Sequence, residues 1–142
     1  MFMGEFNHTV DEKGRVMIPA KFREQLGNCF FVTKGLDGCL TLYTEEEFEK
    51  LQKRIAELSM MDRSARTIRR LFIGSAQEME GDKQGRILLP LPLREYAGIC
   101  KDVVFDGNRD YIEIWDKKKW DEENDIDAEA AAQEIYRNGI LS

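Results

Sequence analysis

Two arginines in equivalent settings are the residues of this sequence whose chemistry is easiest to assign. Arg15 and Arg86 each follow an aspartate by four positions and a glycine by one, in D-E-K-G-R and D-K-Q-G-R. A guanidinium can contact guanine O6 and N7 bidentately in the major groove of DNA, or clamp a phosphate. An ion pair from Asp11 to Arg15 that fixes a turn is the structural alternative, and the two roles are compatible.

Five further bases accompany these arginines and suit a DNA backbone. A point charge is sufficient to hold a phosphate and reads no base sequence. The candidates for this role are Lys13, Lys21, Arg23, Lys83 and Arg94. So few contacts predict weak binding by one subunit, and a useful affinity then requires several subunits on several DNA repeats.

Both arginines lie in a seventeen-residue pattern that the chain contains twice. Residues 11–27 and 82–98 align without a gap and share seven residues, from the aspartate of the turn to the final glycine. Unrelated segments match at roughly one position in seventeen, so a duplication explains the pattern. The turn residues of the two copies are Asp11 and Gly14, and Asp82 and Gly85, since glycine takes a positive φ without strain.

Hydrophobic spacing places these turns between strands and short helices. Strands are predicted at residues 1–10, 15–18, 30–34, 39–43, 76–80, 87–89, 103–105 and 111–115. Helices are predicted at 20–26, at 44–58 behind a Thr44 and Glu47 capping box, after Asp62, after Pro90, and from 117 to about 137. The sequence therefore predicts a mixed α+β fold, mainly β, in which two short repeats share one core.

Four segments follow from this order. We expect a first repeat at 5–47, a helical connector at 48–75, a second repeat at 76–119 and an acidic C-terminal helix at 120–142. The connector carries a cluster of arginines from Arg63 to Arg70. These arginines either meet acids of a neighbouring helix or subunit, or hold a phosphate backbone.

Acidity is concentrated near the C-terminus. The chain has a formal net charge of −6, and seven of its 27 acids lie between Asp121 and Glu134, where there is no base. The remaining residues carry 20 acids against 21 bases, so the overall charge does not exclude nucleic acid as a partner. The alternative to a DNA-binding function is an acidic protein-interaction scaffold that acts through the C-terminal helix.

The sequence does not support several other classes of protein. No apolar run approaches the eighteen or so residues of a membrane helix, and the N-terminus lacks a secretory pattern, so we expect a cytoplasmic protein. The single His8 and three cysteines without C-x-x-C spacing predict no metal site. No nucleophile motif or phosphate loop indicates an enzyme, a cofactor or a small-molecule substrate.

The doubled motif D-x-x-G-R-[VI]-x-[IL]-P-x-x-[FL]-R-E-x-x-G resembles the AbrB-like DNA-binding domain. Two copies with the N-terminus M-F-M-G-E-F-N-H-T-V-D-E-K-G-R make the whole chain similar to the MraZ family. This resemblance implies a swapped-hairpin β-barrel built by both repeats, with helices between the repeats and at the C-terminus. It also implies a ring-like homo-oligomer, associated with the nucleoid, that regulates a division and cell-wall gene cluster. Such a regulator binds repeated sites on double-stranded DNA upstream of its own gene.

The resemblance assigns DNA contacts to the two turn arginines and to the arginine that follows each proline, namely Arg15, Arg86, Arg23 and Arg94. The copies depart from the family pattern unequally, because Pro92 stands where the first copy has Lys21. Both copies also have a glutamate where relatives often carry a second base. We therefore predict a sequence-specific DNA-binding transcription regulator, not an enzyme, whose second repeat binds more weakly or serves structure.

Overall fold

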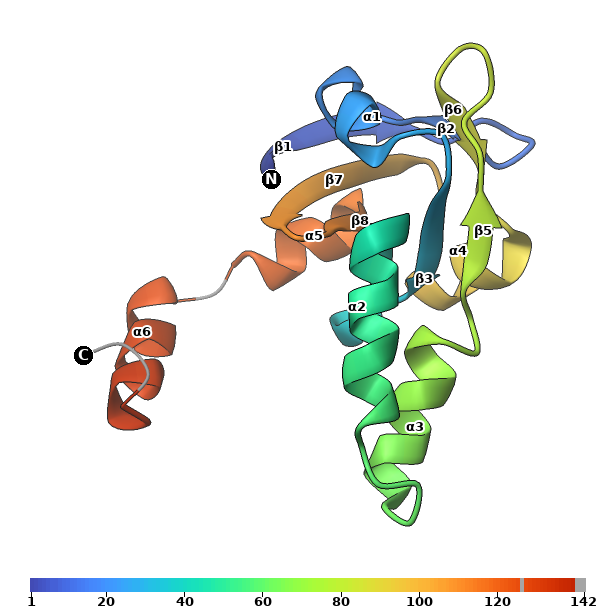
Figure 1. Cartoon of the computed structure of the whole chain (residues 1–142). Helices are drawn as coiled ribbons and strands as arrows, with labels where there is room; N and C mark the ends of the chain where they lie inside the picture. The colour runs from blue at the N-terminus through green and yellow to red at the C-terminus, as the bar shows by residue number, and fades with distance from the viewer. Residues whose placement is uncertain (126, 140–142) are drawn as a thin grey trace.

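The computed structural model describes residues 1–125 and 127–139 (Figure 1). Its strands are β1 (Phe2–Thr9), β2 (Arg15–Met17), β3 (Phe30–Lys34), β4 (Leu40–Thr44), β5 (Gln77–Met79), β6 (Arg86–Leu88), β7 (Asp102–Arg109) and β8 (Ile112–Asp116). Its helices are α1 (Ala20–Leu26), α2 (Glu45–Ala56), α3 (Arg63–Phe72), α4 (Leu91–Ala97), α5 (Lys117–Glu123) and α6 (Ala128–Arg137), with a 3-10 turn η1 (Leu36–Gly38). The predicted mixed α+β class, with mainly antiparallel β structure, is confirmed.

The order of the strands shows how the two repeats are interleaved. Six strands pair in the order β1-β7-β8-β4-β3-β5, and β2 pairs with β6. All of these pairs are antiparallel. Each strand of the first repeat has a counterpart in the second: β1 and β5, β2 and β6, β3 and β7, β4 and β8. Replacing every strand by its counterpart gives the same order, read from the other edge of the sheet. The repeats are therefore related by an internal two-fold axis, and the outer strand of each repeat pairs with a strand of the other.

The strand register fixes where this axis passes. Val16 lies opposite Ile87 at the centre of the β2–β6 pair. Thr41 lies opposite Glu113 at the centre of the β4–β8 pair. Each pair joins residues at equivalent positions of the two repeats, so the axis runs through both strand pairs.

One hydrophobic core serves both repeats. Phe22 and Phe30 of the first repeat belong to the same buried cluster as Ile87 and Phe105 of the second, and none of the four is more than 2% exposed. Full burial of such a side chain stabilises a fold by about 1.5–3 kcal/mol. Separating the repeats would expose this surface in both of them, so the interleaved sheet and the core act together.

Side-chain caps define where the two connecting helices begin. The Thr44 hydroxyl accepts a hydrogen bond from the Glu47 N–H at 3.1 Å, and the Asp62 carboxylate accepts one from the Ser64 N–H at 2.9 Å, as the sequence predicts. In Figure 1, α2 and α3 form a hairpin that projects from one end of the molecule. The β2 and β6 strands and their turns lie at the opposite end.

The prediction of one continuous C-terminal helix is wrong. The segment forms α5 and α6, and Figure 1 shows α6 apart from the rest of the chain. Asn124 ends α5, and the Asp127 carboxylate accepts hydrogen bonds from the N–H groups of Glu129 and Ala130 at 3.1 and 3.2 Å. Asparagine and aspartate side chains compete for backbone partners and therefore favour helix ends. Residues 126 and 140–142 of the predicted helix lie outside the described residues.

A closed barrel is not found among the described residues. The β2 and β6 strands have three residues each and pair with one another as a ribbon beside the six-stranded sheet. Pro19 and Pro90 follow these strands closely, and proline has no N–H to donate to a longer ladder. The predicted barrel is therefore observed as an open sheet with a separate two-stranded ribbon, which we call the β2–β6 ribbon.

Candidate nucleic-acid interface

The Asp11 carboxylate accepts three hydrogen bonds within turn 1, residues 11–15, and two of them come from Arg15. Asp11 Oδ1 accepts from the N–H groups of Lys13 and Arg15, each at 2.9 Å. Asp11 Oδ2 accepts from Arg15 Nε at 2.8 Å. The predicted ion pair is therefore present, and it orients the arginine side chain as well as the turn.

Turn 2, residues 82–86, has the same geometry. Asp82 Oδ1 accepts from the N–H groups of Gln84 and Arg86 at 2.9 and 2.8 Å, and Asp82 Oδ2 accepts from Arg86 Nε at 2.9 Å. Gly14 and Gly85 occupy the same place in the two turns, with φ of 87° and 80°. The two copies of the motif are thus two copies of one local structure.

The exposed face of the β2–β6 ribbon carries both arginines. Successive residues of a strand point to opposite faces, and Val16 and Ile87 are buried, so their neighbours face outward. The outward residues are Arg15, Met17, Arg86 and Leu88, with Arg15 directly opposite Leu88 and Arg86 directly opposite Met17. The two arginines are therefore presented side by side on one surface of the molecule.

Each arginine keeps the outer edge of its guanidinium free. Its Nε donates to the aspartate of its own turn, and within the described residues no hydrogen bond or ion pair engages the Nη atoms of Arg15 or Arg86. The two side chains are 36% and 30% exposed. Two adjacent Nη donors form the fork that matches guanine O6 and N7, or two phosphate oxygens.

The hydrogen bonds of the turns lower the pKa of Asp11 and of Asp82 from the usual value of 3.8. The largest cause is the backbone N–H of Arg15 or Arg86, followed among the lowering causes by that arginine's side chain. A lowered carboxyl pKa in the folded state contributes stability that is present above pH 3.8 and is lost as the pH falls through the lowered value. We expect both carboxyls to titrate below 3.8 in an NMR pH titration, and both turns to be still closed at pH 3.8. Titration of either carboxyl at or above 3.8 would show that its hydrogen bonds are not formed.

The helix arginines lie against the turns of the opposite repeats. Arg23 Nη1 of α1 donates to the carbonyl of Gln84 in turn 2 at 3.4 Å, and its side chain lies over Gly85. Arg94 of α4 lies over Gly14 in turn 1, and its Nε donates to the carbonyl of Leu89 at 2.9 Å. The predicted DNA contacts at these two positions therefore also bridge the repeats, and their contact with DNA stays a prediction.

A Gly85→Ala variant tests this close approach. A Cβ at position 85 would lie 2.6 Å from Arg23 Cδ and collide with the Arg23 guanidinium, in addition to the cost of a positive φ. We expect a loss of stability in urea of more than the roughly 1–2 kcal/mol that the left-handed backbone costs alone. Gly98→Ala is the matched control, since Gly98 has a left-handed backbone with φ 64° and ψ 27°, and an added Cβ there would make only ordinary contacts with the Lys119 side chain, at 3.6 Å or more. The excess over Gly98→Ala should disappear in an Arg23→Ala background, and an equal cost for the two alanines would contradict the close approach.

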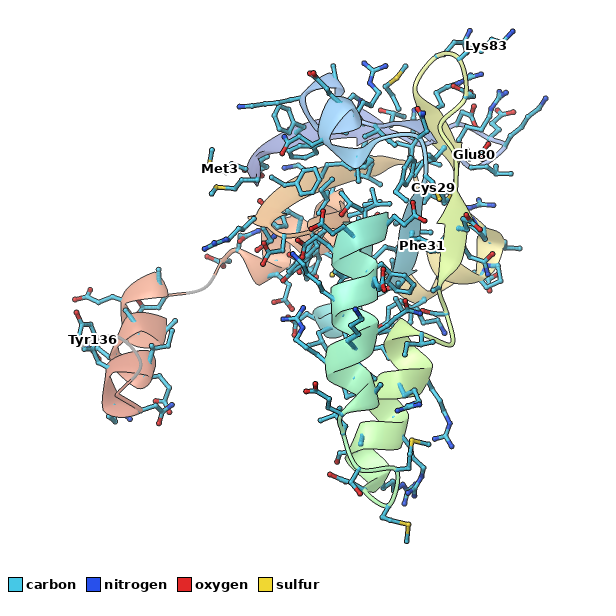
Figure 2. The ribbon with its side chains drawn as sticks, viewed as in Figure 1. Met3, Cys29, Phe31, Glu80, Lys83 and Tyr136 are labelled. Carbon is cyan, nitrogen blue, oxygen red and sulfur yellow. The ribbon has the colours of Figure 1, made fainter. Side chains whose placement is uncertain are left out.

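The predicted lysine contacts are exposed. Lys13 in turn 1, Lys21 on α1 and Lys83 in turn 2 are all exposed. Figure 2 shows Lys83 at the tip of the loop between β5 and β6, pointing away from the molecule. These side chains are free to approach a phosphate backbone, and their role there stays a prediction.

The arginine cluster of the connector lies far from the turns. Arg63, Arg66, Arg69 and Arg70 belong to α3, at the end of the molecule opposite the β2–β6 ribbon (Figure 1). Across residues 1–125 and 127–139, none of them lies within 4 Å of a carboxylate oxygen. The predicted pairing with acids of the same chain is not found, and pairing with another subunit stays a prediction.

A cleft adjoins turn 2, next to a position at which the two repeats differ. Its volume is about 430 Å³, and it is lined by Arg23, Asn28, Phe30, Glu80 and Gly81 among others. At the position equivalent to Gly81, the first repeat has Val10, which is buried in the core. The repeats are therefore not identical in this region, which the comparison of their motifs did not indicate.

Other kinds of site have no support in the part of the chain that the structure describes. No three histidine, cysteine, aspartate or glutamate side chains gather there in a way that would hold a metal ion. None of the helices described has the length and apolar character required to cross a membrane.

Two outward residues of the ribbon were not singled out from the sequence. Met17 and Leu88 each follow the turn arginine by two positions, and alternation along a strand puts residues two apart on one face. This signal was present in R-V-M and R-I-L once the buried Val16 and Ile87 were recognised. The pairing of β2 with β6, which brings the two arginines together, had no such local signal.

Comparison with known proteins yields one family over nearly the whole chain. A family model of the MraZ protein matches residues 1–71 and again residues 72–138. The chain is 48% identical to the transcriptional regulator MraZ of Acetivibrio thermocellus, over 99% of this chain and 100% of that protein. It is 47% identical to the protein of the same name in Clostridium tetani, with the same coverage, and 47% identical to that of a Thermoanaerobacter species, over 95% of this chain and 96% of that one.

Proposed function

The chain belongs to the MraZ family, and we propose that it is a transcriptional regulator that binds DNA with sequence specificity. The names of its full-length relatives support the regulatory role. The arrangement of the β2–β6 ribbon supports the specificity. Two arginines with free Nη donors, each held by its own aspartate, face outward from one narrow surface.

We propose that the β2–β6 ribbon enters the major groove. A major groove about 12 Å wide admits a two-stranded ribbon, and arginine paired bidentately with guanine is the commonest specific contact there. Arg15 and Arg86 are diagonal neighbours on the ribbon, with Cα atoms about 7–8 Å apart in such a position. This spacing corresponds to about two base-pair steps of 3.4 Å. Both repeats therefore read one short site together.

The exposed lysines around the ribbon complete the proposed interface. Lys13, Lys21 and Lys83 contact phosphates on either side of the groove and contribute affinity without sequence preference. Arg23 and Arg94 hold the two turns in place and offer their remaining donors to the backbone. The second repeat has Pro92 where the first has Lys21 on its helix, so the second repeat offers one phosphate contact fewer.

Affinity from one such surface is modest, which favours an assembly. Several subunits that engage repeated sites at once multiply their affinities through effective concentration. We therefore propose that the protein acts as a ring-like homo-oligomer on repeated sites upstream of its own gene, in a division and cell-wall gene cluster on the nucleoid. In this proposal residues 5–47 and 76–119 form the DNA-binding unit as interleaved swapped hairpins, and residues 48–75 and 120–142 serve assembly.

Binding to the DNA upstream of the gene tests the proposal. Fluorescence anisotropy with this duplex and with a scrambled duplex of equal composition should give affinities that differ by about 10³-fold or more. A chain that ends at residue 124 should keep this preference at a lower overall affinity, because α6 takes no part in the ribbon and serves assembly. Equal affinity of the wild type for the two duplexes would contradict a sequence-specific function and favour the acidic scaffold. Loss of the preference only in the shortened chain would show that α6 is required for DNA recognition.

A further inference from the structure

Two apolar side chains accompany the arginines on the exposed face of the β2–β6 ribbon. Leu88 is 57% exposed and lies directly opposite Arg15 in the strand register. Met17 is half-buried and lies directly opposite Arg86. The internal two-fold axis relates the two arrangements, so the ribbon presents one arginine with one apolar residue, twice.

Packing within the chain does not explain these two residues. The core that both repeats share takes Val16 and Ile87 from the same two strands, and neither Met17 nor Leu88 belongs to it. A leucine that stays exposed next to a charged guanidinium gains no free energy from burial of its side chain. A polar residue would suit such a position without that loss. An apolar residue stands at this position in both repeats, which indicates that the two residues have the same role on the outer surface of the ribbon.

We infer that Met17 and Leu88 help to set sequence specificity by contacting the C5-methyl groups of thymines beside the guanines that Arg15 and Arg86 read. This inference rests on the proposed function and adds a second base to each arginine contact. The thymine methyl is the apolar feature that the four natural bases present in the major groove. An aliphatic or thioether side chain at a groove surface has no other apolar partner on a base edge.

The chemistry of the base edges makes such a contact selective. Adenine and cytosine present amino donors in the major groove, and guanine presents two acceptors. An apolar side chain pressed against these groups removes water from them and supplies no hydrogen bond in return, which is unfavourable. Thymine avoids part of this cost, because its methyl group projects beyond the base edge.

The register of the ribbon sets how far apart the two bases lie. Residues directly opposite on paired antiparallel strands have Cβ atoms about 4.5–5.5 Å apart. With base pairs stacked at about 3.4 Å, this separation corresponds to one or two steps. Each arginine and its apolar partner from the other repeat therefore read neighbouring base pairs.

Removing only the thymine methyl tests the inference directly. The duplex upstream of the gene is amplified twice, once with dTTP and once with dUTP, so that the two products differ in methyl groups alone. The intact, assembled wild-type protein is titrated with each product by fluorescence anisotropy at one salt concentration. We expect the uracil duplex to bind more weakly, by about fourfold for each thymine methyl that Met17 or Leu88 touches.

Three variants identify which side chains respond to the methyl group. Leu88→Ala and Met17→Ala should each weaken binding to the thymine duplex and shrink the difference between the two duplexes. Met3→Ala is the matched control, since Met3 is 58% exposed on β1, outside both the ribbon and the segments proposed for assembly. It should leave both affinities and their ratio as in the wild type.

The outcomes separate this inference from the function on which it rests. A wild type that prefers its upstream DNA over a scrambled duplex, and binds the uracil and thymine products equally, overturns the inference alone. A methyl effect that persists undiminished in Leu88→Ala and Met17→Ala also overturns it, because the effect then comes from DNA shape. A change in sedimentation of these variants without a change in DNA preference assigns the two residues to a protein contact instead. A wild type with no preference for upstream DNA overturns the proposed function, and the inference with it.

Discussion

The Arg15→Ala/Arg86→Ala double variant is expected to lose most of its preference for its upstream DNA over a scrambled duplex. Each bidentate contact with guanine discriminates against a wrong base by about 1–3 kcal/mol. Removal of both should therefore reduce the sequence preference by about 30-fold to more than 10³-fold. The measurement is the ratio of dissociation constants for the two duplexes, taken at several salt concentrations.

The salt dependence distinguishes base contacts from phosphate contacts. A Lys13→Ala/Lys83→Ala variant should weaken binding to both duplexes alike and reduce the slope of log K against log salt by about 0.9 for each phosphate that is no longer neutralised. The Arg15→Ala/Arg86→Ala variant should chiefly lose its preference for the upstream duplex over the scrambled one. A Lys117→Ala/Lys118→Ala variant, with the same change of charge on α5 and outside the segments proposed for assembly, is the control and should behave as the wild type.

The double variant is expected to fold like the wild type, because both arginine side chains are partly exposed. Each ends in an ion pair at the surface, and such pairs contribute about 0–1 kcal/mol. Urea unfolding and sedimentation should therefore be similar for the double variant and the wild type. An unchanged preference in a folded double variant would show that D-x-x-x-R serves only as a structural turn.

A Gly107→Ala variant is expected to lose more stability than Gly85→Ala or any of the arginine and lysine variants. Gly107 of β7 pairs with Gly4 of β1, and a Cβ at position 107 would lie 2.5 Å from Met3 N and 2.6 Å from the carbonyl carbon of Phe2. These are backbone atoms of the neighbouring strand, and they cannot rotate away as a side chain would. We expect a cost of about 3 kcal/mol, at the upper end for overpacking.

The effect of this substitution should reach the DNA interface. The β1 strand leads into turn 1, so a shift of β1 away from β7 moves Asp11 and the arginine that it holds. The melting temperature should be about 6–12 °C lower than that of the wild type for a chain of this size. Gly81→Ala is the matched control, since nothing lies within 4 Å of its added Cβ and its backbone is not in the left-handed region. Similar melting temperatures for the two variants would contradict the close approach of β1 and β7.

Local structure was largely predictable from the sequence because local signals determine it. The Asp11 to Arg15 ion pair, the Thr44 and Asp62 caps and the glycines of both turns all act within five residues along the chain. Each of them appears where the sequence places it. The exception is the C-terminal segment, where Asn124 and Asp127 interrupt a pattern rich in alanine and charge.

The assembly of the interface was not predictable from local signals. The pairing of β1 with β7, of β5 with β3 and of β2 with β6 depends on interactions between residues far apart along the chain. The same pairing puts Arg23 over Gly85 and Arg94 over Gly14. The duplicated motif indicated that two halves share a core, and only the strand register shows that both turns form one surface.

The claim that the two arginines read guanine in the major groove is tested most directly on the DNA. The upstream duplex is prepared with 7-deazaguanine in place of guanine, which removes the N7 acceptor and leaves Watson–Crick pairing intact. Wild-type protein is predicted to bind this duplex at least about tenfold more weakly than the natural one, and the Arg15→Ala/Arg86→Ala variant to bind both equally. Equal binding of the wild type to the two duplexes would contradict guanine reading and assign the arginines to phosphates or to structure.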